Sequence, residues 1–108
     1  MLNKEQMQEL KKEAGSLTLS KFGSARRQYL YNNPHLMNEY LRSGILVEHL
    51  NDIDNEALAE RDRIMKIQMN HDGVNEELKA SDFSLYLQKL QAIEMDVSLQ
   101  IMHDIIYA

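Results

Sequence analysis

Two long amphipathic segments, at residues 46–70 and 75–107, constrain the fold of this chain more than any other feature. Each carries apolar residues at the three- and four-residue steps of an α-helix, so each presents a continuous apolar stripe that another helix must cover. The break between them is His71-Asp72-Gly73-Val74, which is short enough to turn the chain back on itself. We therefore predict an all-α fold built on a long antiparallel helical hairpin, with residues 45–72 and 75–107 as its arms.

The N-terminal part predicts shorter helices that pack on this hairpin. Residues 2–14 have a helical pattern that stops at Gly15, and residues 16–20 alternate polar and apolar, as an extended connector does. The helical pattern returns at residue 21. Asn33 and Pro34 predict a new helix, with Asn33 as N-cap, and Gly44 can end it in the left-handed conformation. The chain is thus expected to be a single helical domain, 1–108, with a short helix and connector at 1–20 and short helices at 21–43.

The second arm has a predicted start and one candidate irregularity. Asn75 can cap it, and Glu76 and Glu77 then lie in its first turn, where negative charge is favoured. Ser81-Asp82 is the candidate irregularity, because short polar side chains compete for backbone hydrogen bonds. The two long stripes extend beyond what the short helices can cover, so we expect a homodimer or a protein partner.

Composition narrows the class of protein. The 108 residues suit one domain. Without cysteine there is no disulfide, thiol nucleophile or cysteine metal site. No apolar run approaches the ~18 residues of a membrane span, and the stretch MLNKEQMQELKKEAG lacks the apolar core of a signal peptide. These observations lead us to expect a cytoplasmic protein that does not associate with membranes.

Charge is distributed unevenly within the net −5. Residues 1–44 hold seven basic and four acidic side chains, whereas the remainder holds five basic and thirteen acidic ones. Contact with a nucleic-acid backbone would therefore have to use the N-terminal part. The candidate residues for such contact are Lys21, Arg26, Arg27 and Arg42. The interpretation we prefer is intramolecular, in which an acidic run docks Arg26, Arg27 or Arg42 of the N-terminal helices. The residues of that run are Asp52, Asp54 and Glu56.

No pattern of residues indicates a reaction. None of the four histidines belongs to an H-E-x-x-H motif or to the paired Glu-x-x-His motif of di-metal bundles. Ser43-Gly44 is a helix end rather than a nucleophile elbow, and no glycine-rich loop is present to cradle a nucleotide. We predict no enzymatic activity, no cofactor and no metal, with a site centred on a carboxylate or on His49 as the enzyme alternative.

Several short stretches follow a known pattern in order and spacing. They are Gly23, Arg26-Arg27, Tyr29-Leu30, Tyr40-Leu41, Ser43-Gly44, Leu46, His49-Leu50, Asp52-Ile53-Asp54, Ala57, Gln68-Met69, Gly73-Val74, Glu77-Leu78-Lys79-Ala80, Asp82 and Ile106-Tyr107. Over residues 22–107 the chain resembles the TnpV family, small proteins encoded on transposons and conjugative elements of Gram-positive bacteria. The resemblance implies a helical fold and a mobile-element setting, but no mechanism.

The chain departs from the family pattern in its last helix. Where the family usually has Trp-Val, this chain has Tyr86 and Leu87. Where the family has Asn and a second Arg, it has Gln91 and Glu94. The roles of the family's residues at these positions therefore do not carry over to this divergent member.

Taken together, these observations predict a non-enzymatic accessory protein of a mobile genetic element that acts through helix-mediated association with itself or with another protein. The alternative is a DNA-binding regulator or transposition accessory factor that uses Lys21, Arg26, Arg27 and Arg42 of the basic N-terminal helices.

Overall fold

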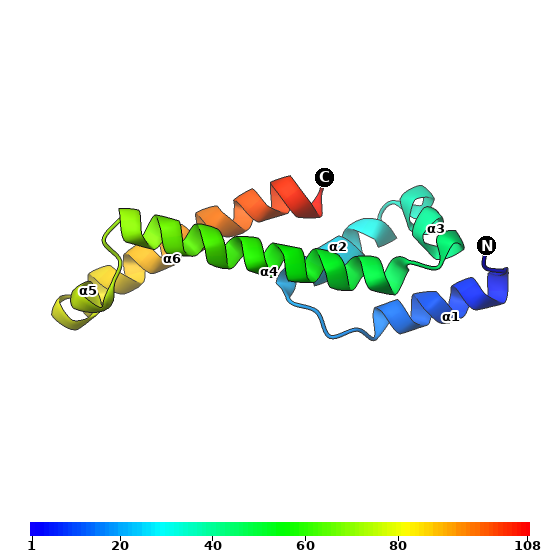
Figure 1. The fold of residues 1–108 in the computed structure, drawn as a ribbon, viewed down its shortest axis with the longest axis horizontal. Helices are drawn as coiled ribbons and strands as arrows, with labels where there is room; N and C mark the ends of the chain where they lie inside the picture. The colour runs from blue at the N-terminus through cyan, green and yellow to red at the C-terminus, as the bar shows by residue number, and fades with distance from the viewer.

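The computed structural model describes all residues, 1–108, and contains helices without any strand, which confirms the predicted all-α class. The elements are α1 (Lys4–Gly15), α2 (Lys21–Tyr31), α3 (Pro34–Ser43), α4 (Leu46–His71), α5 (Glu76–Ser81), α6 (Phe83–Ile101) and a final π-helical turn, η1 (Met102–Ile106). The molecule is elongated, with extents of 60 × 22 × 19 Å (Figure 1). None of its helices combines the length and apolar character needed to cross a bilayer.

Helix α4 is the central element of the molecule, because α1, α2, α3, α6 and η1 all pack along it, whereas α5 packs on α6 (Figure 1). Helices α1, α2 and α3 surround its first half, and α6 runs antiparallel along its second half. Two apolar clusters result. The first-half cluster contains Ala14, Leu30, Met37, Leu41, Leu46 and Leu50. The second-half cluster contains Phe22, Ala57, Met65, Val74, Ile93, Val97, Ile101 and Ile106. The short helices therefore cover one end of α4 rather than the whole hairpin.

The second arm of the predicted hairpin is not one continuous helix. Asp82 leaves the helical conformation, with φ −150° and ψ 83°, and its side chain accepts a hydrogen bond from the Leu85 amide at 3.0 Å. This side-chain cap starts α6 afresh and leaves α5 as a separate helix of 6 residues. The predicted cap at Asn75 is confirmed, since its side chain accepts from the Leu78 amide at 2.9 Å. The long hairpin is thus formed by α4 and α6.

The predicted boundaries of α3 are confirmed with one difference. Gly44 ends the helix with φ 76°, as expected of a left-handed cap. Asn33 occupies the N-cap position, but its side chain makes no capping bond. Its amide nitrogen instead donates to the Tyr29 carbonyl at 2.7 Å, so the side chain joins α3 to the end of α2.

We expect Gly73→Ala to lower the free energy of unfolding by about 1–2 kcal/mol, because Gly73 has φ 68° and the left-handed conformation is unfavourable for a residue with a Cβ. No atom lies within 4 Å of the position of that Cβ, so the backbone alone accounts for the loss. Urea unfolding measures it. Gly15→Ala is the control, because Gly15 is helical and its Cβ would lie in ordinary contact with Tyr31. Equal effects of the two substitutions would contradict this account.

Candidate functional site

A buried carboxylate, that of Asp54, lies at the point where the two halves of the molecule meet. Asp54 is 9% exposed and projects from α4 to the N-terminus of α2. There it accepts hydrogen bonds from the Ser20 amide at 3.2 Å, from the Ser20 hydroxyl, and from the Gly23 amide at 2.9 Å. These amides are donors that the first turn of a helix leaves free, and a negative charge is favoured beside them. Asp54 therefore attaches α2 to α4.

The residue at position 23 must be small for this contact to form. A Cβ built on Gly23 would lie 2.7 Å from Oδ1 of Asp54 and 2.9 Å from its Cβ. Because these distances are below van der Waals contact, only glycine allows α2 and α4 to approach so closely. Gly23 has a negative φ, so close approach rather than backbone conformation explains it.

One turn further along α2, Arg26 is a buried cation with 4% exposure. Its Nη1 donates to the carbonyl of Ile106 at 2.8 Å and to that of Ala108 at 3.3 Å. Its Nε donates to Nε2 of His49 at 3.1 Å. Its Nη2 donates to the hydroxyl of Tyr40 at 3.5 Å. The guanidinium thus donates to backbone carbonyls, a neutral imidazole and a hydroxyl, and it joins Ile106 and Ala108 to α2, α3 and α4.

The imidazole of His49 is held neutral by its surroundings. Burial lowers its pKa, the neighbouring charge of Arg26 lowers it further, and Asp52 raises it in opposition. The ring also stacks on Tyr40 with a centroid distance of 4.1 Å. A neutral His49 can accept the hydrogen bond from Arg26, whereas a protonated one would repel it.

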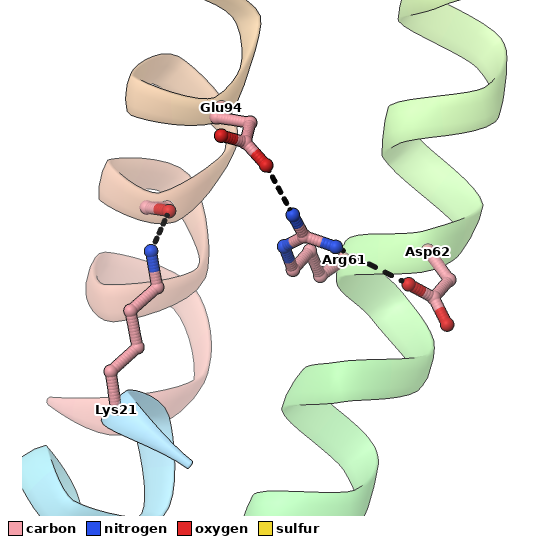
Figure 2. Close-up of polar contacts among 5 residues, drawn as sticks. Lys21, Arg61, Asp62 and Glu94 are labelled. Atoms are coloured by element: carbon pink, nitrogen blue, oxygen red, sulfur yellow. Dashed lines mark hydrogen bonds and ion pairs between the residues drawn. The ribbon is translucent and has the colours of Figure 1, made fainter. Parts of the chain in front are cut away.

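The other cations proposed for nucleic-acid contact have different surroundings. Nη1 of Arg27 donates to the carbonyls of Ala14 at 3.0 Å and Leu17 at 3.1 Å, which fastens α1 and its connector to α2. Lys21 donates to the hydroxyl of Ser98 on α6 at 2.7 Å (Figure 2). Arg42 is exposed at the end of α3. Three of the four candidate residues therefore make side-chain contacts within the fold.

The acidic run does dock the N-terminal helices, but through one carboxylate and without arginine. Asp54 binds backbone amides and a hydroxyl, as described above. Asp52 is exposed and acts on His49 through space. Glu56 lines a groove of about 240 Å³ between α4 and the end of the chain, together with Glu60 and Asp104. That groove is acidic, so any ligand it held would have to be cationic.

Glu94, which stands where the family pattern has Arg, forms a cross-helix ion pair. Nη2 of Arg61 on α4 lies 2.5 Å from its carboxylate, and Asp62 lies on the other side of the same guanidinium (Figure 2). Tyr86 packs against the second-half cluster, whereas Leu87 and Gln91 are exposed. The departure at position 94 is thus matched by a charge on the facing helix.

An exposed apolar stripe runs along α6 outside its contact with α4, and one edge of it lines a groove between the two helices. Leu85, Met95 and Leu99 are 37%, 67% and 64% exposed, and Ala92 is exposed between them. The spacing of 85, 92 and 99 is seven residues, and Met95 lies beside them on the helix surface. None of these four side chains packs against either apolar cluster. We refer to Leu85, Ala92, Met95 and Leu99 as the outer stripe.

Sequence reasoning did not identify the Asp54 contact with the start of α2 or the partners of Arg26. Ser20 carried a usable signal, because a serine just before a helical pattern is a favourable N-cap, and it caps α2 at Phe22. Gly23 was noted only as part of a family pattern. The carbonyls that receive Arg26 lie 80 residues away along the chain, and no local pattern marks them.

Comparison with known proteins gives one match. A family model described as transposon-encoded protein TnpV matches residues 6–106. No curated protein sequence and no solved structure matches the chain. The matched range includes Asp54, Arg26 and every residue to which they are hydrogen-bonded except Ala108.

We expect Asp54→Ala to lower the free energy of unfolding by about 3 kcal/mol, because it leaves buried donors of Ser20 and Gly23 without an acceptor. Gly23→Ala should cost about 1–3 kcal/mol by steric conflict at the same contact. Asp52→Ala is the matched control, since its side chain is exposed. Chemical unfolding measures all three. If Asp52→Ala lowered the free energy of unfolding as much as Asp54→Ala does, burial of the Asp54 carboxylate would not explain the loss.

We expect His49 to make the fold less stable as the solution becomes acidic. The unfolded chain protonates this histidine from about pH 6.5 downward, whereas the folded chain does so only at lower pH. The unfolded state therefore binds more protons, and stability falls as pH falls through this window. Replacing His49 by Gln should remove that part of the pH dependence, measured by unfolding at pH 7.5 and pH 5.5. His103→Gln, at an exposed position, should leave it in place.

Proposed function

Because the chain belongs to the TnpV family of transposon-encoded proteins, we propose that it is a non-enzymatic accessory protein of a mobile element, which acts in the cytoplasm by helix-mediated association through the outer stripe of α6. The observation that carries the proposal is the exposure of four apolar residues along one side of a well-formed helix. An apolar stripe at heptad spacing on one helix is the pattern by which helices recognise one another.

The rest of α6 supports this interpretation, because its opposite side already has a partner. Ile93, Val97 and Ile101 are buried against α4 and complete the second-half cluster. The outer stripe is therefore additional to the residues that the fold needs. A helix that is apolar on two sides is typical of one packed between two neighbours.

The exposed area of the molecule also leaves room for a partner. The accessible surface is 7135 Å². A compact monomer of 12.6 kDa exposes roughly 6,200 Å² by the usual scaling with mass. The elongated shape accounts for this excess of about 900 Å², and surface is therefore available for the ~800 Å² that each partner contributes to an interface of standard size.

The buried polar groups favour a structural role over catalysis. Asp54 binds backbone amides and a hydroxyl, and Arg26 binds carbonyls and His49. These contacts hold helices together and leave no buried side-chain polar atom without a partner. A catalytic acid or base needs a proton donor or acceptor that is available to a substrate in a cleft, and neither Asp54 nor Arg26 offers one.

The DNA-binding alternative has less support, because Lys21, Arg26 and Arg27 make contacts within the fold and Arg26 is buried. Arg42 remains exposed, and one cation gives a small electrostatic footprint. Fluorescence anisotropy with a labelled duplex at low salt separates the two functions. Strong binding that falls steeply with added salt and weakens in Arg42→Ala would favour DNA binding over protein association.

We expect the double variant Met95→Glu/Leu99→Glu to lose association, because it places two charges in an interface that the proposal requires to be apolar. Sedimentation velocity of the purified protein measures the mass of the associated species. Ile67→Glu is the matched control, since Ile67 is an exposed apolar residue of α4, 58% accessible, outside the outer stripe. Far-UV circular dichroism checks that each variant is folded. Association that survives the double variant would contradict the proposal.

A further inference from the structure

We propose that the partner is a second copy of this chain, bound by antiparallel pairing of the two outer stripes, with Lys89 of each copy beside the partner's Asp96. This inference rests on the proposed function and adds the identity of the partner, the direction of the helices and their register. It is carried by the positions of apolar and charged residues on the exposed side of α6.

The exposed side of α6 follows a heptad pattern over two repeats. If Leu85, Ala92 and Leu99 occupy the first apolar position of the heptad, then Gln88 and Met95 occupy the second one, three residues later. All five residues are exposed. They span about 21 Å along the helix. Because α6 is already folded on α4, pairing does not have to supply the energy of helix formation.

In an antiparallel pair, the two central layers each place a large side chain against a small one. In antiparallel pairing, each first apolar position faces a second apolar position of the other helix. With the register centred between residues 93 and 94, Ala92 faces the partner's Met95, and Gln88 faces the partner's Leu99. The central layers thus combine a methyl group with a flexible thioether that can fill the space around it. The arrangement is two-fold symmetric, so both copies use the same surface.

The charged residues beside the outer stripe fit the same register. Lys89 and Asp96 are exposed, and both line the groove of about 330 Å³ that lies between α6 and the second half of α4, on one flank of the stripe. Within the chain, Lys89 donates to the carbonyl of Asp72 at 3.3 Å. The pKa of the Asp72 carboxyl group is lowered, mainly by side-chain hydrogen bonds and also by the charge of Lys89, but Lys89 forms no ion pair and neither does Asp96. In the antiparallel register Lys89 lies beside the partner's Asp96 on both sides of the two-fold axis. On the same flank, Asp82 lies beside the partner's His103.

Other arrangements lack this complementarity. Shifting the antiparallel register by one heptad in one direction places the two copies of Lys89 together, and the opposite shift places the two copies of Asp96 together. In a parallel pair, Lys89 and Asp96 would lie beside the uncharged Ser84 and Gln91. Like charges in contact oppose association. The charges therefore favour one direction and one register for the pairing of two copies of α6. A different protein as partner would not require Lys89 and Asp96 to complement each other.

The experiment reverses each charge separately and then mixes the variants. Lys89→Glu alone and Asp96→Lys alone each turn two attractive pairs into two repulsive ones, so we expect the dimer dissociation constant to rise about tenfold. An equimolar mixture of the two variants should form heterodimers of near wild-type stability, because each repulsive residue then meets an opposite charge. The double variant Lys89→Glu/Asp96→Lys should recover self-association. Sedimentation velocity measures all four cases.

Lys66→Glu, at an exposed position of α4, controls for the change in net charge and should leave the dimer intact. Recovery in the mixture shows that both single variants fold. A wild-type chain that stays monomeric at high micromolar concentration would overturn the inference, as would a dimer that neither reversal weakens. In the latter case, loss of the dimer in Met95→Glu/Leu99→Glu would leave the proposed function standing. A dimer insensitive to that double variant as well would overturn both.

Discussion

The contact on which this structure depends is the buried carboxylate of Asp54 at the start of α2. The apolar clusters lie on either side of it along α4, and Phe22 of α2 belongs to the second-half cluster, so apolar packing brings α2 against α6 and η1 without fixing its exact position. Asp54 fixes that position, because hydrogen bonds to amides are directional whereas apolar contacts are not. With α2 held there, Arg26 is placed one turn further on, where it reaches the carbonyls at the end of the chain.

Much of the fold could be predicted from local patterns. Helical periodicity, glycine caps and Asn75 identified α1 to α4 and the turn at Gly73, because these features depend on neighbours a few residues apart. The break at Asp82 was visible only as an irregularity, since a capping aspartate and an exposed aspartate within a helix look alike in sequence. That the short helices surround one half of α4 depends on side-chain packing and could not be read from periodicity.

The candidate site was less predictable, for a physical reason. Asp54 and Arg26 were singled out as an acid and a base that could attract each other. In the structure each is instead satisfied by backbone groups, which every residue carries and which therefore leave no mark in the sequence. The outer stripe of α6 was missed for a different reason. In the sequence, a helix that is apolar on two sides shows one broad apolar stripe, and only its packing on α4 shows which apolar residues stay exposed.

The bond from Arg26 to Ile106 has a consequence for the order of folding during synthesis. Residues up to about 70 can assemble the first-half cluster as soon as they leave the ribosome, because all its members lie within them. The guanidinium of Arg26 stays in contact with water until η1 packs on α2, since the carbonyl of Ile106 that accepts its hydrogen bond lies 80 residues further along the chain. The burial of Arg26 therefore couples the folding of the first half of the molecule to the docking of α6 and η1.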